Sequence, residues 1–131
     1  MKRLATTLMV VLALMLPPIV PVAHAQACVG LSTQLTPMDF ETITVSTVAI
    51  GFTASKISTA TAKASYAFFT LETADIRYRV DGVDPTAAVG HAATSTVPGY
   101  FVCGITAVSQ FRAIRSGGSD STMRVTYFKG A

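Results

Sequence analysis

The sequence predicts an all-β fold, a small antiparallel β-sandwich built from six to seven short strands. Runs rich in β-branched and aromatic residues recur along the chain, and Gly, Pro, Asp and Ser separate them. No segment beyond residue 25 carries the sustained helical periodicity of an amphipathic helix. Because the chain has only 131 residues, we expect one domain at most.

Residues 1–25 have the pattern of a secretory signal peptide. Two basic residues stand near the start, an apolar run covers residues 8–16, and a small-residue site ends at Ala25. We therefore expect cleavage before Gln26 and a single β-sandwich domain over 26–131. The protein would then be exported to the periplasm or to the extracellular space.

Two alternatives to this cleavage stay open. An uncleaved segment would anchor the chain in a membrane, but the apolar run is short for about 30 Å of hydrocarbon, and prolines follow it at once. Lipoprotein processing at Cys28 is the other alternative, although residues 25–27 fit its usual tripeptide poorly. We expect contact with a membrane only through an uncleaved signal segment.

The charge balance gives no support to a nucleic-acid partner. The full chain has 10 Lys and Arg against 7 Asp and Glu, but Lys2 and Arg3 belong to the predicted signal. Residues 26–131 therefore carry eight basic and seven acidic side chains, a net charge of +1. Nucleic-acid binding requires a clustered basic face. We expect protein partners instead, including a homo-oligomer.

Cys28 and Cys103 are the two cysteines of the chain. In an oxidising compartment we expect a disulfide between them, which would close a loop of about 75 residues and contribute roughly 4 kcal/mol in chain-entropy models. The alternative is a pair of free thiols, because the sequence does not give the distance between the two residues.

The strand predictions follow from alternating or continuous apolar runs. A strand over 66–71 should form a hairpin with a strand over 75–80, because only a turn fits between them. Residues 39–41 should turn, and 54–65 should be a surface connection with at most one helical turn. Gly51 indicates a bulge in a long strand, or a break between two shorter ones. The predicted strands cover 42–53, 66–71, 75–80, 100–103, 111–115 and 123–128, with an edge strand or an ordered lead-in over 28–37.

The strand over 75–80 is predicted to end in a rigid surface turn. Asp81 can bond its own backbone and Gly82 accepts the positive φ of a tight turn. Asp84 is held extended by Pro85, which donates no ladder hydrogen bond. The two aspartates could instead ligate calcium or serve a hydrolase, but a calcium loop needs more oxygen ligands and a glycosidase a richer pocket.

Arginines are the one polar concentration in the chain. Arg77 and Arg79 share one face of a strand, with Tyr78 between them, and Arg112, Arg115 and Arg124 fall on the last two predicted strands. One interpretation is a surface that binds an anion or a partner through guanidinium groups, with Arg77, Arg79, Arg112, Arg124 and Tyr78 as its residues. The other is a solvated sheet face whose arginines pair with nearby acids, namely Glu72, Asp75, Asp81 and Asp84.

No catalytic, metal or cofactor site is predicted. His91 is the single histidine after residue 25, and a lone histidine in a loop is usually solvated or hydrogen-bonded. No serine lies in a nucleophile-elbow pattern, and no second histidine is available for a triad. We therefore expect a protein that is not an enzyme. A small hydrolase using Asp81, Asp84 and His91 is a weaker hypothesis that would require a cleft gathering them.

The segment Phe68–His91 and the two strands at 111–115 and 123–128 resemble a family of small uncharacterised proteins of tailed phages and prophages. Together they cover most of the region from Ala64 to Phe128. The resemblance implies a β-sandwich that joins the surface of a head or tail as a minor virion component. Members of that family usually lack a signal peptide.

The run Arg-Tyr-Arg-Val-Asp-Gly-Val-Asp-Pro-Thr over 77–86 is also similar to a signature of immunoglobulin-like modules attached to secreted glycoside hydrolases. Both resemblances imply an all-β module, immunoglobulin-like or jelly-roll-like. The first hypothesis is a minor virion protein or phage-encoded surface protein, of the decoration type. The alternative is an exported accessory module that binds glycans or cell-wall material through exposed tyrosines, for which the candidates are Tyr66, Tyr78, Tyr100 and Tyr127.

Overall fold

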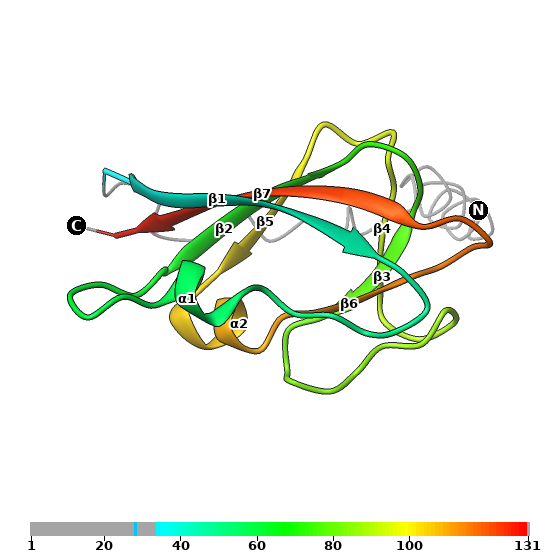
Figure 1. The fold of residues 1–131 in the computed structure, drawn as a ribbon, viewed down its shortest axis with the longest axis horizontal. Helices are drawn as coiled ribbons and strands as arrows, with labels where there is room; N and C mark the ends of the chain where they lie inside the picture. The colour runs from blue at the N-terminus through cyan, green and yellow to red at the C-terminus, as the bar shows by residue number, and fades with distance from the viewer. Residues whose placement is uncertain (1–27, 29–33, 131) are drawn as a thin grey trace, which may run out of the picture.

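The computed structural model describes Cys28 and residues 34–130, and within them it has two antiparallel sheets packed face to face (Figure 1). The predicted signal at 1–25 lies outside the described residues. The four-stranded sheet contains β1 (Thr36–Val45), β7 (Ser121–Lys129), β2 (Tyr66–Leu71) and β5 (Tyr100–Cys103), in that spatial order. The three-stranded sheet contains β4 (His91–Ala93), β3 (Ile76–Arg79) and β6 (Arg112–Arg115), also in spatial order. The predicted all-β sandwich is confirmed.

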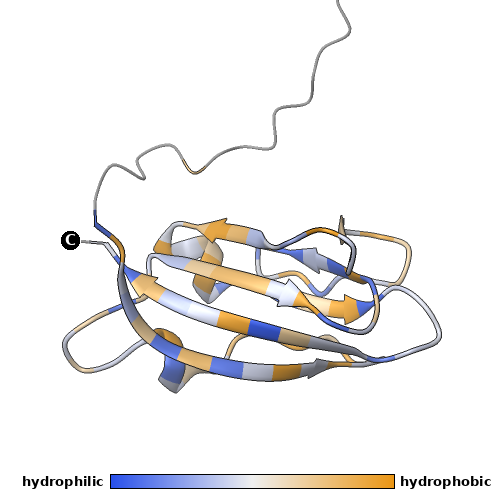
Figure 2. Cartoon of the chain, turned by 90° about the horizontal axis from the view of Figure 1, so that it is seen from above, coloured by the Kyte–Doolittle hydropathy of each residue, from blue (hydrophilic) through white to orange (hydrophobic). Residues whose placement is uncertain are grey.

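Alternation of apolar and polar residues turns one side of each strand toward the space between the sheets (Figure 2). In β7, Met123, Val125 and Tyr127 are fully buried, whereas the residues between them are at least partly exposed. In β2 the same period buries Ala67, Phe69 and Leu71. Two-residue periodicity thus decides which side of each strand becomes core.

Aromatic rings fill the centre of the sandwich. Phe111 stacks on Phe52 with ring centroids 4.0 Å apart, and Phe69 lies 5.6 Å from Phe111 and 5.2 Å from Tyr100. Tyr78 of β3 adds a ring 5.6 Å from Phe111. Offset and edge contacts of this kind contribute roughly 0.5–1.5 kcal/mol per pair beyond the burial of apolar area.

Tyr127 brings a hydroxyl into this core, and Glu41 of β1 accepts its hydrogen bond. The same Glu41 carboxylate accepts the backbone N–H of Thr53 at 3.0 Å. Burial, and then the bond to Glu41, raise the pKa of Tyr127. The polar tip of the largest fully buried side chain is therefore satisfied, as a buried hydroxyl requires.

The predicted hairpin between 66–71 and 75–80 is wrong. β2 pairs with β5 and β7, whereas β3 pairs with β4 and β6, so the two strands lie in different sheets. The apolar sides of both strands cover the same core from opposite layers, which a hairpin within one sheet would not achieve. Likewise β6 and β7, joined by the Gly-rich turn at 116–119, belong to different sheets.

The first predicted strand is also misplaced. β1 begins at Thr36 and ends at Val45, so residues 39–41 form part of a strand and not a turn, with a register irregularity between Pro37 and Asp39. After Val45 the chain moves to the three-stranded sheet, where Ile50 forms an isolated bridge to Ala113. The 42–53 run is therefore divided between the two sheets.

Two short helices and one short strand complete the described part. α1 (Ala54–Ile57) is the single helical turn that the 54–65 connection allowed. α2 (Ile105–Ser109) and β4 were not predicted. Gly104, at φ +100°, precedes α2, and Val108 holds that helix in the core. No helix in the described residues is long and apolar enough to cross a membrane.

Candidate functional site

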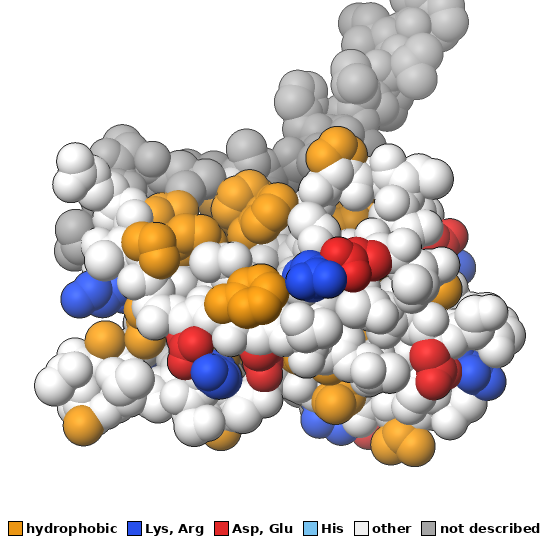
Figure 3. Space-filling model, turned by 45° about the horizontal axis from the view of Figure 1, so that its top comes forward, with side chains coloured by type: hydrophobic (Ala, Val, Ile, Leu, Met, Phe, Trp, Pro, Cys, Tyr) orange, Lys and Arg blue, Asp and Glu red, His pale blue; other side chains and the backbone are white. Residues whose placement is uncertain are grey.

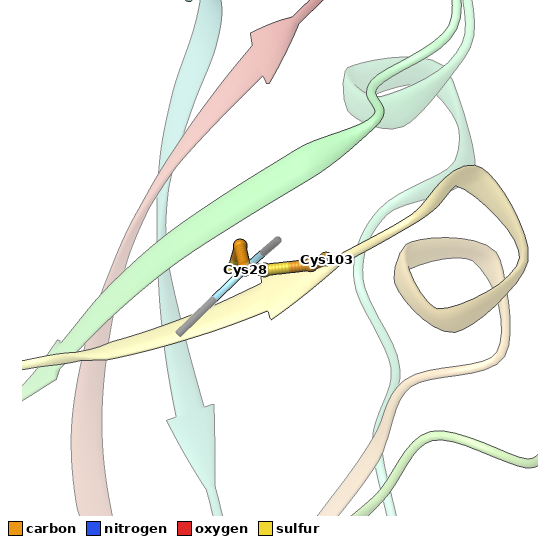
Figure 4. The surroundings of a disulfide bond; sticks show 2 residues. All are labelled: Cys28 and Cys103. Carbon is orange, nitrogen blue, oxygen red and sulfur yellow. A yellow bond between two sulfur atoms is a disulfide. The ribbon is translucent and has the colours of Figure 1, made fainter. Parts of the chain in front are cut away.

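Cys28 and Cys103 form a disulfide at the end of β5, with Cα atoms 5.8 Å apart (Figure 4). That separation lies within the usual range for a disulfide, and the bond closes a loop across 75 positions of sequence. The predicted pairing is confirmed, and neither residue is a free thiol. The disulfide attaches the chain around Cys28 to an edge strand of the four-stranded sheet.

Three of the predicted arginines share the outer side of the three-stranded sheet. We call Arg77, Arg79 and Arg112 the arginine face. Arg79 and Arg112 stand directly opposite each other on β3 and β6. Asp81 forms an ion pair with Arg79, and Asp84 accepts a bond from Arg112 Nε at 2.5 Å. Each of the two guanidinium groups is thus paired with a carboxylate of the adjoining loop.

The remaining guanidinium contacts of this face are with backbone carbonyls. Arg112 donates to the oxygen of Ala49 at 3.0 Å, and Arg77 donates to that of Gly90 at 3.2 Å. The arginines therefore fasten the loops at 46–50 and 81–90 to the sheet. This arrangement corresponds to the solvated, acid-paired interpretation of the arginine cluster.

Arg124 and Tyr78 do not belong to this face. Arg124 lies on β7 in the other sheet and pairs with Glu72. Tyr78 points into the core, where its ring lies 5.8 Å from that of Phe69, and burial raises its pKa. Arg115 bonds Asp120 at 2.7 Å. The structure thus divides the residues that the sequence grouped together.

The predicted turn residues organise the loop that carries these acids. Asp81 Oδ1 accepts the N–H of Val83 at 3.2 Å, and Gly82 has φ +79°. The hydrogen bond from Arg79 lowers the pKa of Asp81 to about 2. Pro85 is buried, while Asp84 stays exposed apart from its bond to Arg112. The side chains of Asp81, Asp84 and Pro85 thus each make a contact that stabilises the loop.

The hydrolase hypothesis finds no shared cleft in the described residues. His91 lies at the edge of the small sheet, its ring 5.4 Å from that of Tyr78. A cavity of about 190 Å³ lies instead beside α1 and α2. Among the residues that the structure describes, no group of three or more His, Cys, Asp or Glu is placed to hold a metal ion. The cavity is lined by Ile57, Ser58, Lys63, Ala64, Ile105, Val108 and Ser109.

The outer side of the four-stranded sheet carries five aromatic side chains, of which the sequence analysis singled out only Tyr66. Two consecutive rows of residues across the sheet contain them. Phe68 pairs with Phe101 on β5 and with Thr126 on β7, which in turn pairs with Phe40 of β1. We call the set the aromatic face, and it consists of Phe40, Tyr66, Phe68, Phe101 and Phe128.

Two rings of this face are exposed to solvent, and the other three are partly buried. Phe40 is 49% exposed and Phe101 is 50% exposed, while Phe68 lies 4.8 Å from Phe101, centroid to centroid. Figure 3 shows hydrophobic side chains gathered on this side, with a basic and an acidic side chain together at the border. The Phe68 ring occupies the space that a Cβ on Gly99 would take, so it covers the backbone of Gly99, the residue before β5.

The other half of the same sheet face is polar. Beyond the aromatic rows the outward positions carry hydroxyls and one ion pair, between Arg124 and Glu72. A second ion pair, between Lys56 of α1 and Asp39 at 2.9 Å, lies at the β1 edge but on the inner side of the sheet, because Asp39 stands opposite the buried Tyr127. The sheet face therefore consists of an apolar patch with a polar border, whose hydroxyls belong to Thr42, Thr44, Thr70 and Thr122.

The signal for this face was present in the sequence. Tyr66-Ala67-Phe68-Phe69-Thr70-Leu71 has large apolar residues at both odd and even positions, so one strand covers the core and also exposes rings. Comparisons with protein-family models, curated proteins and solved structures found no significant match to the chain.

Proposed function

We propose that the protein is a non-enzymatic interaction protein that attaches to a larger protein assembly through the aromatic face. The observation that carries this proposal is the set of five aromatic side chains on the outer side of a regular sheet, of which Phe40 and Phe101 are about half exposed. Monomeric soluble proteins rarely expose large contiguous apolar patches, and such patches mark interaction sites.

The composition of the aromatic face favours a protein partner. Protein–protein contacts typically have a centre rich in Tyr, Phe and Arg that is depleted of other charges, within a polar border. Phe68, Phe101 and Phe40 supply such a centre, and the Arg124–Glu72 pair lies in the border. The arginine face is less suited, because its guanidinium groups already bind acids and carbonyls of the same chain.

The assembly that we name is the surface of a phage particle, where the protein would be a minor virion or decoration-type component. This choice rests on the resemblance of residues 64–128 to small tailed-phage proteins. Mass spectrometry of particles purified from a producing host should then detect the peptides of this chain. Their absence from the particles would contradict the virion role.

The contact surface can be tested in the same preparation. Phe101→Asp puts a charge in the centre of the aromatic face, and we expect it to release the protein from the particles. Val48→Asp is the matched control, because Val48 is 74% exposed and lies in the loop after β1, outside the face. Equal release by both variants would contradict attachment through the aromatic face.

A second candidate function is an exported module that binds glycans or cell-wall material. The signal pattern at 1–25 favours it, and a disulfide is typical of an oxidising compartment. Detection of Gln26 as the mature N-terminus in a periplasmic or culture fraction would support export. The predicted set of exposed tyrosines needs correction, since Tyr127 is fully buried and Tyr100 packs on Phe69 in the core.

Tyr66 is the tyrosine that remains on the aromatic face. If a polysaccharide binds there, Tyr66→Ala should weaken retention of the protein on insoluble cell-wall material at least severalfold. Unchanged retention would exclude binding through this face. The matched control is Tyr100→Phe, which keeps the buried ring and removes a hydroxyl bonded to Thr94.

A further inference from the structure

We infer that Arg79 and the backbone carbonyl of Gln110 protect the bond between Asp81 and Gly82 from rearranging to an isoaspartyl bond. An aspartate followed by glycine rearranges more readily than other aspartates, because glycine has no side chain that hinders the attacking nitrogen. Asp81 and Gly82 are the one such pair in the chain, and both are exposed in the loop after β3. This inference goes beyond the proposed function and is independent of it, because it concerns the loop beside the arginine face.

The rearrangement goes through a cyclic succinimide. The backbone nitrogen of Gly82 attacks the side-chain carbonyl carbon of Asp81, and one water molecule leaves, made of the nitrogen's proton and the carboxyl's hydroxyl group. One water molecule then opens the ring at either carbonyl, which gives aspartate or isoaspartate with no change in mass. The ring closes from the protonated carboxyl group, because a carboxylate has no hydroxyl to release. The reaction therefore requires a neutral Asp81 and a Gly82 nitrogen that is free to attack.

Arg79 opposes the first requirement, because it keeps Asp81 ionised. Its Nε donates to Asp81 Oδ1 at 3.0 Å, and its Nη2 forms the ion pair with Oδ2. On the neighbouring strand Arg112 is paired with Asp84, so Arg79 is the cation that Asp81 binds. With a pKa of about 2 in place of 3.8, the protonated fraction of Asp81 near neutral pH falls by up to about sixtyfold. Because 51% of the Asp81 side chain is exposed, screening by water makes this an upper value.

Gln110 opposes the second requirement, because it binds the attacking nitrogen. The N–H of Gly82 donates to the carbonyl oxygen of Gln110 at 3.1 Å. The Gln110 side chain also packs beside Gly82, since a Cβ added there would lie 3.7 Å from Gln110 Cγ. Asp81 Oδ1 accepts the N–H of Val83 at 3.2 Å as well. Both reacting groups are therefore held in hydrogen bonds to other atoms.

Rearrangement would alter the loop that satisfies the arginine face. An isoaspartyl bond leads the main chain through the side chain of Asp81, which adds one carbon to the backbone and leaves a carboxylate on Cα. Asp84, which binds Arg112, belongs to the same loop. The lengthened backbone changes the positions of both carboxylates relative to Arg79 and Arg112. The ion pair of Arg79 thus preserves the carboxylate that it binds.

Prolonged incubation of the purified full chain near neutral pH, followed by peptide mapping, measures isoaspartate at position 81. An isoaspartyl peptide keeps its mass and elutes from a chromatography column at a different time. Arg79→Gln should raise the rate at least about tenfold, because it removes the cation that holds Asp81 ionised. Arg79→Lys keeps a positive charge, so its rate should lie closer to that of the wild type than to that of Arg79→Gln. The wild-type chain unfolded in urea should react faster than it does when folded.

Arg112→Gln is the matched control, because it breaks the other ion pair of the same loop and leaves Arg79 in place. Its rate at Asp81 should stay near that of the wild type. Equal acceleration by Arg79→Gln and Arg112→Gln would overturn the inference, since general loosening of the loop would then be the cause. An unchanged rate in Arg79→Gln would overturn it, and so would equal rates in the folded and the urea-unfolded wild type.

Hydrogen exchange of the Gly82 amide gives a second measurement that needs no variant. In the wild type this amide should exchange at least about tenfold more slowly than that of Gly117, which donates no hydrogen bond to another described residue. Equal exchange of the two amides would contradict the part assigned to Gln110.

Discussion

The two outer faces of the sandwich differ in how their side chains are satisfied. On the three-stranded sheet, Arg79 and Arg112 bind Asp81 and Asp84, and Arg77 binds the carbonyl of Gly90. On the four-stranded sheet, the exposed rings contact other rings or solvent. Polar groups can be satisfied locally by short loops, whereas exposed apolar rings are satisfied only by removal from water.

This difference shows why a cluster of charged residues in a sequence is a weaker indicator of a binding surface than exposed aromatic residues are. An arginine cluster is conspicuous, but its meaning depends on whether acids lie within reach. The loop at 81–84 places two acids there. Exposed aromatic residues carry more information, because Phe40 and Phe101 stay about half exposed among the residues that the structure describes.

The largest effect that we expect concerns the covalent attachment beside the aromatic face. Cys103→Ser removes the disulfide at the edge of β5, and for a loop of 75 positions the free energy of unfolding should fall by about 4 kcal/mol. Urea unfolding followed by circular dichroism measures the change. The reduced wild-type protein is the control and should lose a similar amount. An unchanged midpoint would show that the sheets are stable without this bond.

A smaller effect should come from a glycine under the aromatic face. In Gly99→Ala the new methyl group meets the ring of Phe68, which must rotate away from the sheet. Because the ring can move, we expect about 1 kcal/mol or less in the free energy of unfolding. Attachment to phage particles should nevertheless weaken severalfold, as measured by the fraction of protein that sediments with the particles.

Gly117→Ala is the matched control for that change, since a Cβ at Gly117 meets nothing within 4 Å. Its expected effect on both measurements is negligible. If both glycine variants keep full attachment to the particles, the position of the Phe68 ring has no part in the contact. The comparison between the two faces would then rest on Phe40 and Phe101 alone.

The smallest effect should appear on the arginine face. The bond from Arg79 lowers the pKa of Asp81 from 3.8 to about 2, so Arg79→Gln should return it toward 3.8. An NMR titration of the Asp81 carboxyl group measures this. The stabilisation from the lowered pKa is present above about pH 4 and is lost as pH falls toward 2. The variant should therefore lose less stability over that interval.

Arg115→Gln is the control for this titration, because Arg115 pairs with Asp120 elsewhere in the structure. It should leave the Asp81 titration as it is. An Asp81 midpoint that stays low in Arg79→Gln would mean that another group holds the carboxylate. The arginine face would then be less self-contained than its ion pairs indicate.

Sequence periodicity was sufficient to predict most of the strands and which side of each strand is buried. Alternation predicted the core side of the 75–80 and 123–128 strands, and both agree with the buried positions Ile76, Met123 and Val125. Pairing was not predictable in the same way. A short connection such as 72–75 can turn within a sheet or cross between sheets, and only packing of both apolar sides on one core decides.

The candidate surfaces were predicted in part. The side-chain direction of Arg77 and Arg79 followed from alternation, but their acid partners depended on a loop conformation. The aromatic face required the neighbours of each strand, because Phe40 and Phe101 are far apart in sequence and share a row only through β7 and β2. The three-residue strand β4 and the helix α2 are too short to give a periodic signal.

The spatial order β1-β7-β2-β5 has a consequence for biosynthesis. The last strand of the chain occupies an interior position, and β1 finds its hydrogen-bonding neighbour only in β7. A nascent polypeptide consequently cannot complete its larger layer until β7 has been synthesised, so β1 stays without its neighbour while β2 and β5 can already pair. Both cysteines, by contrast, emerge before β7 and can join earlier.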